Sequence, residues 1–189
     1  MKKTMTFLSA LLISSGLMAQ TSVETERQYL SGRGCDDMVQ WDFYCTGGNN
    51  SGKWTKIGVP SCWELQGFGT YQYGMRFYGE AFPEGIADEK GMYKYEFELP
   101  AEWNGRQVEL VFEACMTDTE VKINGRKGGS MHQGGFYRFV YDVSDRVFFG
   151  SEKKNVLEVT VSKESTNAGV NLSERRADYW NFGGIIRPV

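Results

Sequence analysis

The sequence predicts an all-β fold, a β-sandwich of the jelly-roll kind. Three observations predict it. Several segments alternate apolar and polar side chains with a period of two, glycine-rich turns separate them, and no segment after the N-terminal leader has the pattern of a capped amphipathic helix of three or more turns. A chain of 189 residues with 23 glycines and 4 prolines is long enough for one such sandwich with a sizeable core.

The clearest strand covers residues 93–99. Its aromatic and aliphatic side chains alternate with Lys94, Glu96 and Glu98, so that one face can be buried while the other meets water. Further strands are expected at residues 41–45, 54–59, 107–112, 121–123, 136–143 and 157–161. Asn124-Gly125 follows one of them and is the strongest short signal for a hairpin with a type I′ turn.

Two segments have a less regular pattern. Residues 67–91 are rich in glycine and tyrosine without a clear period, which indicates a long loop with one short strand. Near the C-terminal end, Ile185, Ile186 and Val189 have the character of the start of a buried strand. Because no turn or polar residue follows them, this strand is expected either to lack sheet neighbours or to continue into further residues.

The N-terminus has the features of a secretory signal peptide. Lys2 and Lys3 precede a short apolar run at residues 7–17, and Ala19 offers a small residue for cleavage. The run is well short of the ~20 residues that span a bilayer, so no membrane span is expected. Residues 1–19 are therefore predicted to be removed, and the product to be secreted or periplasmic. The remaining 170 residues have a net charge of −5, because the leader contains two lysines and no acid, and this sign argues against nucleic acid as a partner.

The cysteines and the single histidine do not indicate a metal site. Cys35, Cys45, Cys62 and Cys115 match no zinc-binding spacing. In an oxidising compartment disulfides are permitted, so a link between Cys35 and Cys45 stays open, whereas Cys115 is expected to be a small buried residue. His132 lies among glycines and is expected in a flexible loop with an exposed ring.

Several segments resemble, in order and spacing, the N-terminal sugar-binding domain of glycoside hydrolase family 2, which includes β-galactosidases, β-glucuronidases and β-mannosidases. The resemblance covers about residues 41–189. It rests on Val-Pro-Ser-Cys-Trp-Glu at 59–64, Tyr-Lys-Tyr-Glu-Phe at 93–97, Trp-Asn-Gly-Arg at 103–106, Leu-Val-Phe-Glu at 110–113, Val-Lys-Ile-Asn-Gly at 121–125, Gly-Gly-Phe-Tyr at 134–137, Asn-Val-Leu-Glu-Val at 155–159, and Asp-x-Trp with Gly-Gly-Ile-x-Arg-x-Val at 178–189.

The resemblance implies a galactose-binding-domain-like jelly roll over residues 20–189. In such proteins an immunoglobulin-like domain and a TIM barrel follow, and the barrel supplies the two glutamates of a retaining β-glycosidase. A barrel needs roughly 200 residues or more, which this chain cannot house. The chain alone is therefore expected to be inactive, with a β-linked glycan and the remaining domains of a larger secreted glycosidase as its partners.

Three residues are the candidates for carbohydrate binding. Asp178 matches the family aspartate that reaches the sugar directly or through a sodium ion, and its alternative is a solvated acid or one paired with Arg175 or Arg176. Trp180 is expected either to stack on a pyranose ring or to pack against the barrel. Tyr73 stands where β-galactosidases often carry an asparagine, a departure that weakens an assignment to galactose.

Two other functions remain open from the sequence. The first is a free-standing carbohydrate-binding module or lectin-like protein, for which the jelly roll and the aromatic content are suitable. The second is an interrupted gene product without activity. No cofactor is expected to be required. A bound sodium or calcium ion follows from the resemblance alone, since no acidic cluster in the sequence marks a site.

Overall fold

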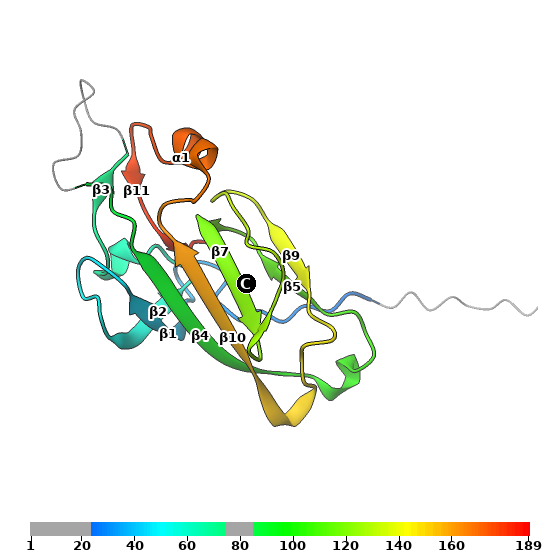
Figure 1. Cartoon of the computed structure of the whole chain (residues 1–189). Coiled ribbons are helices and arrows are strands. Elements are labelled where there is room, and N and C mark those ends of the chain that lie inside the picture. The colour runs from blue at the N-terminus through cyan, green and yellow to red at the C-terminus, as the bar shows by residue number, and fades with distance from the viewer. Residues whose placement is uncertain (1–23, 75–84) are drawn as a thin grey trace, which may run out of the picture.

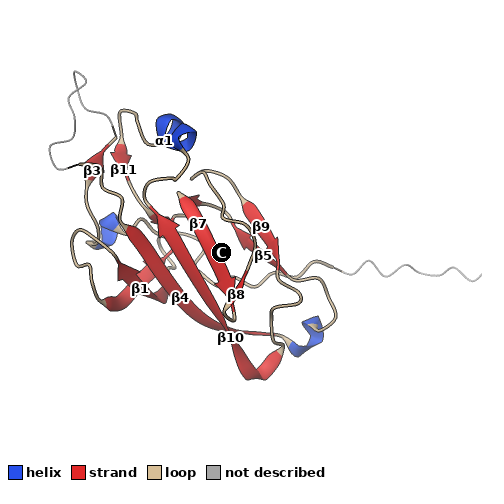
Figure 2. Cartoon of the chain, in the orientation of Figure 1, coloured by secondary structure: helices blue, strands red, loops and turns tan. Residues whose placement is uncertain are grey.

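The computed structural model describes residues 24–74 and 85–189, and its main element is a six-stranded antiparallel sheet (Figures 1 and 2). The strand order in this sheet is β2-β1-β4-β10-β7-β8. Its strands are β1 Val39–Cys45, β2 Trp54–Val59, β4 Lys90–Leu99, β7 Asp118–Ile123, β8 Arg126–Lys127 and β10 Gly150–Ser162. The predicted signal peptide and Tyr78, a further tyrosine of the predicted loop, lie outside the described residues.

Three two-stranded antiparallel ladders complete the strands. They pair β5 Glu109–Phe112 with β9 Phe139–Asp142, β6 Cys115–Met116 with β12 Gly184–Ile185, and β3 Gln72–Tyr73 with β11 Trp180–Asn181. The first two ladders contribute buried side chains to the same core as the six-stranded sheet and form the opposing layer of the sandwich. The β3–β11 ladder lies at one end of the molecule (Figure 1). The predicted all-β sandwich is confirmed.

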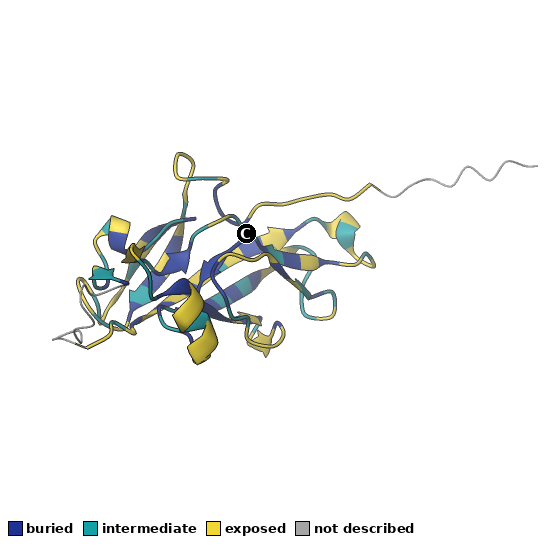
Figure 3. Ribbon diagram, turned by 90° about the horizontal axis from the view of Figure 1, so that it is seen from above, coloured by how far each residue is buried: buried dark blue, intermediate teal, exposed yellow. Residues whose placement is uncertain are grey.

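The core explains why these residues form strands. In β10 the side chains of Leu157, Val159 and Val161 are at most 1% exposed and alternate with partly exposed neighbours. In β4, Tyr93 and Phe97 are buried and the three charged residues between and beside them are exposed. Burying each large apolar side chain contributes about 1.5–3 kcal/mol, so the alternation fixes which face of each strand turns inward (Figure 3).

Each predicted strand is present, although most begin at a different residue than expected. The predicted segment 54–59 is β2 itself, and the expected type I′ turn is present, with φ of +51° at Asn124 and +77° at Gly125. The segment 136–143 is shorter than expected. It forms β9 only from Phe139 onward, and Phe136 is exposed.

The segment 184–189 is not short of sheet neighbours, so that expectation is corrected. Ile185 lies opposite Cys115, and the backbone N–H of Glu113 donates to Pro188 O at 3.0 Å. On its other side, the N–H of Leu30 donates to Val189 O at 2.9 Å. The apolar residues of this segment are therefore held between the edge of the opposing layer and the N-terminal segment.

One short α-helix, α1 Ala168–Glu174, was not predicted. Its seven residues amount to fewer than three turns, and the Asn167 side chain caps it by accepting a hydrogen bond from the Gly169 N–H at 2.9 Å. At its C-terminal end, Glu174 Oε2 accepts from the Gly135 N–H at 2.7 Å. Within the described ranges, no helix has the length and apolar character required to span a membrane.

Two further expectations concern the cysteines and His132. All four cysteines are free thiols: Cys35 is exposed and Cys45 is buried, so the link that the sequence left open is not formed, while Cys115 is buried as expected. The expectation for His132 is wrong. Its ring is half-buried and stacks on Phe139 with centroids 3.9 Å apart, and its backbone exchanges two hydrogen bonds with Thr119.

Candidate functional site

The β3–β11 ladder brings the three predicted carbohydrate-binding residues together. Tyr73 on β3 lies opposite Trp180 on β11, and the Gly74 N–H donates to Tyr179 O at 2.7 Å. Asp178 lies two residues before Trp180, at the same end of the ladder. Because paired strands lie about 4.8 Å apart, residues separated by more than one hundred positions become neighbours.

In the described part of the chain, Asp178 is held by Tyr73 and not by Arg175 or Arg176. The Tyr73 hydroxyl donates a hydrogen bond to Asp178 Oδ1, which raises the pKa of Tyr73 and keeps this hydroxyl protonated. Arg176 instead pairs with Glu164 at 2.6 Å, and Arg175 donates to Phe182 O at 2.9 Å. Within residues 24–74 and 85–189, neither Arg175 nor Arg176 pairs with Asp178, so this alternative is corrected.

The second carboxylate oxygen of Asp178 differs from the first in its hydrogen bonding. Among residues 24–74 and 85–189, Oδ2 has no hydrogen-bond partner, and the Asp178 side chain is exposed. A carboxylate with one oxygen anchored presents its remaining lone pairs in a fixed direction. Such a group can accept hydrogen bonds from the hydroxyls of a sugar.

Aromatic rings lie beside this carboxylate. Trp180 is 50% exposed, and its ring centroid lies 5.3 Å from that of Tyr73 and 5.9 Å from that of Tyr71, in both cases edge to face. These contacts fix the orientation of the indole while leaving half of its surface accessible. An accessible indole next to a hydroxyl acceptor can stack on the apolar face of a pyranose ring. We call Tyr73, Asp178 and Trp180 the ladder site.

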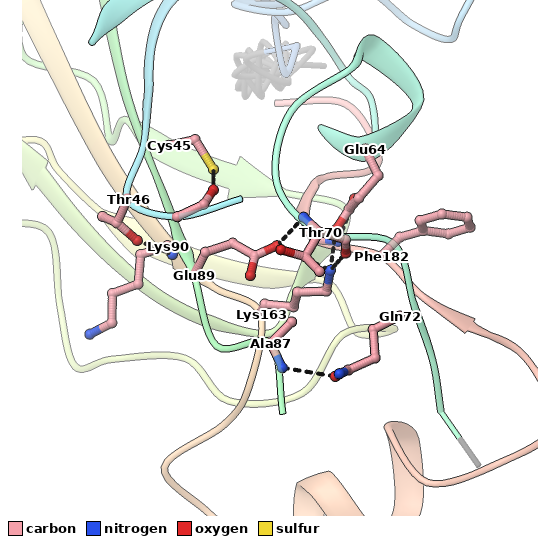
Figure 4. Close-up of polar contacts among 12 residues, drawn as sticks. Cys45, Thr46, Glu64, Thr70, Gln72, Ala87, Glu89, Lys90, Lys163 and Phe182 are labelled. Carbon is pink, nitrogen blue, oxygen red and sulfur yellow. Dashed lines mark hydrogen bonds and ion pairs between the residues drawn. The ribbon is translucent and has the colours of Figure 1, made fainter. Parts of the chain in front are cut away.

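A buried charge cluster lies directly beside the ladder, and the sequence did not predict it (Figure 4). The Lys163 ammonium lies 2.7 Å from Glu64 Oε1 and 3.2 Å from Glu89 Oε1, with at most 4% of any of the three side chains exposed. Lys163 Nζ also donates to Thr70 O, and the Thr70 N–H donates to Glu89 Oε1 at 2.7 Å. Burial raises the pKa of the Glu64 carboxyl, and the neighbouring Lys163 opposes that rise. We call Glu64, Glu89 and Lys163 the lysine cluster.

The described residues do not assemble a metal centre. No group of three or more histidine, cysteine or acidic side chains within them could hold an ion. Sodium or calcium needs several oxygen ligands, and Asp178 offers a single carboxylate. Asp178 by itself therefore does not complete a site for such an ion.

A groove elsewhere on the molecule does not contain the ladder site. It has a volume of about 720 Å³ and lies between the six-stranded sheet, β5 and the segment around Leu30 and Val189. Its lining combines apolar core residues such as Phe97 and Leu110 with charged residues such as Glu26 and Arg106, and none of the three predicted carbohydrate-binding residues borders it. We place the candidate site at the ladder because the three predicted carbohydrate-binding residues meet there.

Comparison with known proteins decides the family. The family model described as "Glycosyl hydrolases family 2, sugar binding domain" matches residues 48–189. The chain belongs to this family. The matched range contains the whole ladder site and the lysine cluster of this family 2 sugar-binding domain.

The curated relatives of this sugar-binding domain are glycosidases. A β-glucuronidase of Bacteroides fragilis is 27% identical over 136 residues, which cover 71% of this chain and 17% of the relative. A β-galactosidase of Priestia megaterium is 28% identical over 145 residues, which cover 72% of this chain and 13% of the relative. The chain thus spans less than a fifth of the length of the relatives it matches.

Solved structures agree on the fold. The Bacteroides uniformis β-glucuronidase superimposes with a TM-score of 0.57 at 21% identity, covering 86% of this chain and 17% of that one. At this identity the likeness concerns the fold of the family 2 sugar-binding domain alone. The predicted family and the galactose-binding-domain-like sandwich are confirmed.

Proposed function

We propose that this chain is the N-terminal, non-catalytic domain of a secreted or periplasmic retaining β-glycosidase, and that its ladder site forms one wall of the sugar pocket. The observation that carries the proposal is the meeting of Tyr73, Asp178 and Trp180 where two strands about one hundred residues apart in the sequence pair. The lysine-rich, apolar leader at residues 1–19 supports export.

Each side chain of the ladder site has a role that follows from its chemistry. Asp178 accepts hydrogen bonds from sugar hydroxyls, Tyr73 holds its carboxylate by a hydrogen bond, and Trp180 offers an apolar surface to the ring. The two carboxyl groups of the retaining reaction, about 5–5.5 Å apart, belong to the barrel that we expect to follow in the longer polypeptide. In that protein this domain braces the barrel and binds the non-reacting part of the substrate.

The comparisons do not favour a free-standing carbohydrate-binding module or lectin. The curated relatives and the solved structures described above are glycosidases, and this chain covers only a small share of each. A free-standing binder also has to reach its affinity with the ladder site alone. That site consists of one carboxylate and a few rings, so we expect dissociation constants of the order of 1 mM for simple sugars.

Two experiments on the purified chain test the proposal. Aryl β-D-galactoside, β-D-glucuronide and β-D-mannoside should all remain intact. Hydrolysis that is lost when one acidic residue is replaced would contradict the proposal. In calorimetric titrations with galactose, glucuronate and mannose, Asp178→Asn should weaken any binding roughly ten-fold, because a hydrogen bond to a charged group contributes about 1.5–3 kcal/mol. Asp36→Asn, an exposed acid in a turn elsewhere, is the matched control. Micromolar binding by the wild type would instead support the module.

A further inference from the structure

If the register of the β3–β11 ladder is extended beyond its two pairs, Thr70 comes to stand opposite Gly183, three residues beyond the Tyr73–Trp180 pair. In an antiparallel ladder every second pair exchanges backbone hydrogen bonds, and the bond from the Gly74 N–H to Tyr179 O sets that alternation. The same alternation makes Thr70 and Gly183 a hydrogen-bonding pair. The described structure contains no backbone bond between them.

The lysine cluster occupies the place of that missing bond. Thr70 O accepts from Lys163 Nζ, Lys163 Nζ contacts Glu64 Oε1 at 2.7 Å, and the two Glu64 oxygens accept from the Gly183 N–H at 3.1 and 3.0 Å. One continuous chain of polar contacts therefore connects the two segments at the point where no backbone bond joins Thr70 to Gly183. Figure 4 shows Lys163 reaching between Glu64 and Thr70.

The cluster is also fixed on its other side. Glu89 Oε1 accepts from the Thr70 N–H at 2.7 Å and lies 3.2 Å from Lys163 Nζ. Both backbone groups of Thr70 are thus bound by charged side chains that solvent does not reach. No water can replace a lost contact without entering the core, so the separation of the two strands depends on the side chains themselves.

We propose that Lys163 is a positioning residue for the ladder site: through Thr70 on one strand and Glu64 with Gly183 on the other, it sets the separation at which Tyr73 meets Asp178 and Trp180. The inference rests on the proposed role of these three residues in sugar binding. Lys163 itself is fully buried and contacts no sugar.

Removal of the Lys163 charge is the first test. In Lys163→Met the Thr70 carbonyl loses its donor and the two carboxylates lose their cation. The affinity for sodium D-glucuronate and D-galactose, whichever the wild type binds, should fall roughly ten-fold. A nuclear Overhauser contact between the Trp180 indole and the Tyr73 ring, measured without sugar, should be lost. If Lys163→Met retains both the affinity and that contact, the inference is overturned.

The double variant Lys163→Met with Glu64→Gln separates positioning from stability. Glu64→Gln neutralises one of the two buried carboxylates that Lys163→Met leaves without a cation, and this restores part of the lost stability. We therefore expect the midpoint of urea unfolding to recover in part in the double variant while the Trp180–Tyr73 contact and the affinity do not. Recovery of all three together would show a merely stabilising role and overturn the inference. If Lys163→Met does not fold, the affinity and the Trp180–Tyr73 contact are measured in the double variant instead.

Two controls complete the design. Asn155→Ala removes a buried polar side chain in the N-terminal half of β10, where Asn155 bonds the Phe148 backbone, and it should lower stability without changing affinity. Asp178→Asn reports on the proposed function itself. If Asp178→Asn leaves sugar binding intact, the proposed function fails. If it weakens binding while Lys163→Met does not, the positioning role alone fails.

Discussion

Gly183 leaves no room for a side chain beside Trp63. A Cβ added at Gly183 would lie 2.1 Å from Cζ2 of the indole, far inside any van der Waals contact. The two backbones are also joined, since the Trp63 N–H donates to Gly183 O at 3.0 Å. The indole of Trp63 is fully buried, so it cannot move aside into solvent. The position that links β11 to the lysine cluster is therefore set by close packing as well as by charge.

Gly183→Ala should destabilise the domain by about 1–3 kcal/mol, because overpacking of a close-packed site forces backbone shifts. The backbone at Gly183 does not have a left-handed φ, so the clash alone produces the effect. Urea unfolding followed by tryptophan fluorescence measures it. Gly34→Ala is the matched control: nothing lies within 4 Å of its added Cβ, and it should change stability by less than about 0.5 kcal/mol. Equal midpoints for the two variants would contradict the packing described here.

Glu64 should make the stability depend on pH in a definite direction. Burial raises the pKa of Glu64 above its ordinary value of 4.5. The folded state then binds this proton more tightly than the unfolded chain does. The contribution of Glu64 to stability is therefore fully present below the unfolded pKa and is lost as the pH rises through the folded pKa.

The Glu64→Gln variant isolates this dependence, because glutamine does not titrate. The free energy of unfolding of the wild type minus that of the variant should decrease as the pH rises from about 4.5 to 8. Urea unfolding of both proteins over that range is the measurement. A difference that grows with pH would mean that Lys163 stabilises the Glu64 carboxylate by more than burial penalises it.

His132 should titrate below its ordinary pKa of 6.5. Burial lowers the pKa of the imidazole, which stacks on Phe139 and has Nε2 3.0 Å from Gly134 O. Stability linked to this ring is present above the unfolded pKa and is lost as the pH falls through the folded one. The chain contains one histidine, so a proton NMR titration of its ring signal gives the value directly. A pKa of 6.5 or higher would indicate the exposed ring expected from the sequence.

Thiol reactivity should follow burial. Cys35 is exposed, whereas burial raises the pKa of Cys62 to about 11 and raises that of the buried Cys115 further. At about pH 8 a disulfide reagent should therefore modify Cys35 rapidly and the other thiols only after unfolding. Cys35→Ser should abolish the rapid phase. If no thiol reacts until the protein is reduced, Cys35 is in a disulfide after all.

Strands that alternate strictly could be predicted because their pattern reports burial directly. The segment 157–161 lies within β10 with the expected alternation of burial, and the Asn124-Gly125 turn adopts the expected backbone. The β3–β11 ladder could not be found in this way. Each of its strands has two residues, which is too short to show a period, and the pairing joins segments about one hundred residues apart.

The candidate site was predicted in part. The Asp-x-Trp resemblance pointed to Asp178 and Trp180, but nothing in the sequence indicates that Tyr73 donates to that aspartate. Glu64 and Lys163 were missed because charged side chains are almost always exposed, unless they are paired. The one available signal was the position of Glu64 next to Trp63 in the Val-Pro-x-x-Trp-Glu segment.

The location of the bound sugar tests the central claim most directly. The ¹⁵N-labelled chain is titrated with sodium D-glucuronate and D-galactose up to saturating concentrations, and the Trp180 indole N–H signal is assigned from Trp180→Phe. The ladder site predicts that the largest saturable shifts fall on Trp180, Tyr73 and Asp178, and that they disappear in Asp178→Asn. Saturable shifts confined to another part of the domain, such as the groove beside Leu30 and Val189, would contradict it.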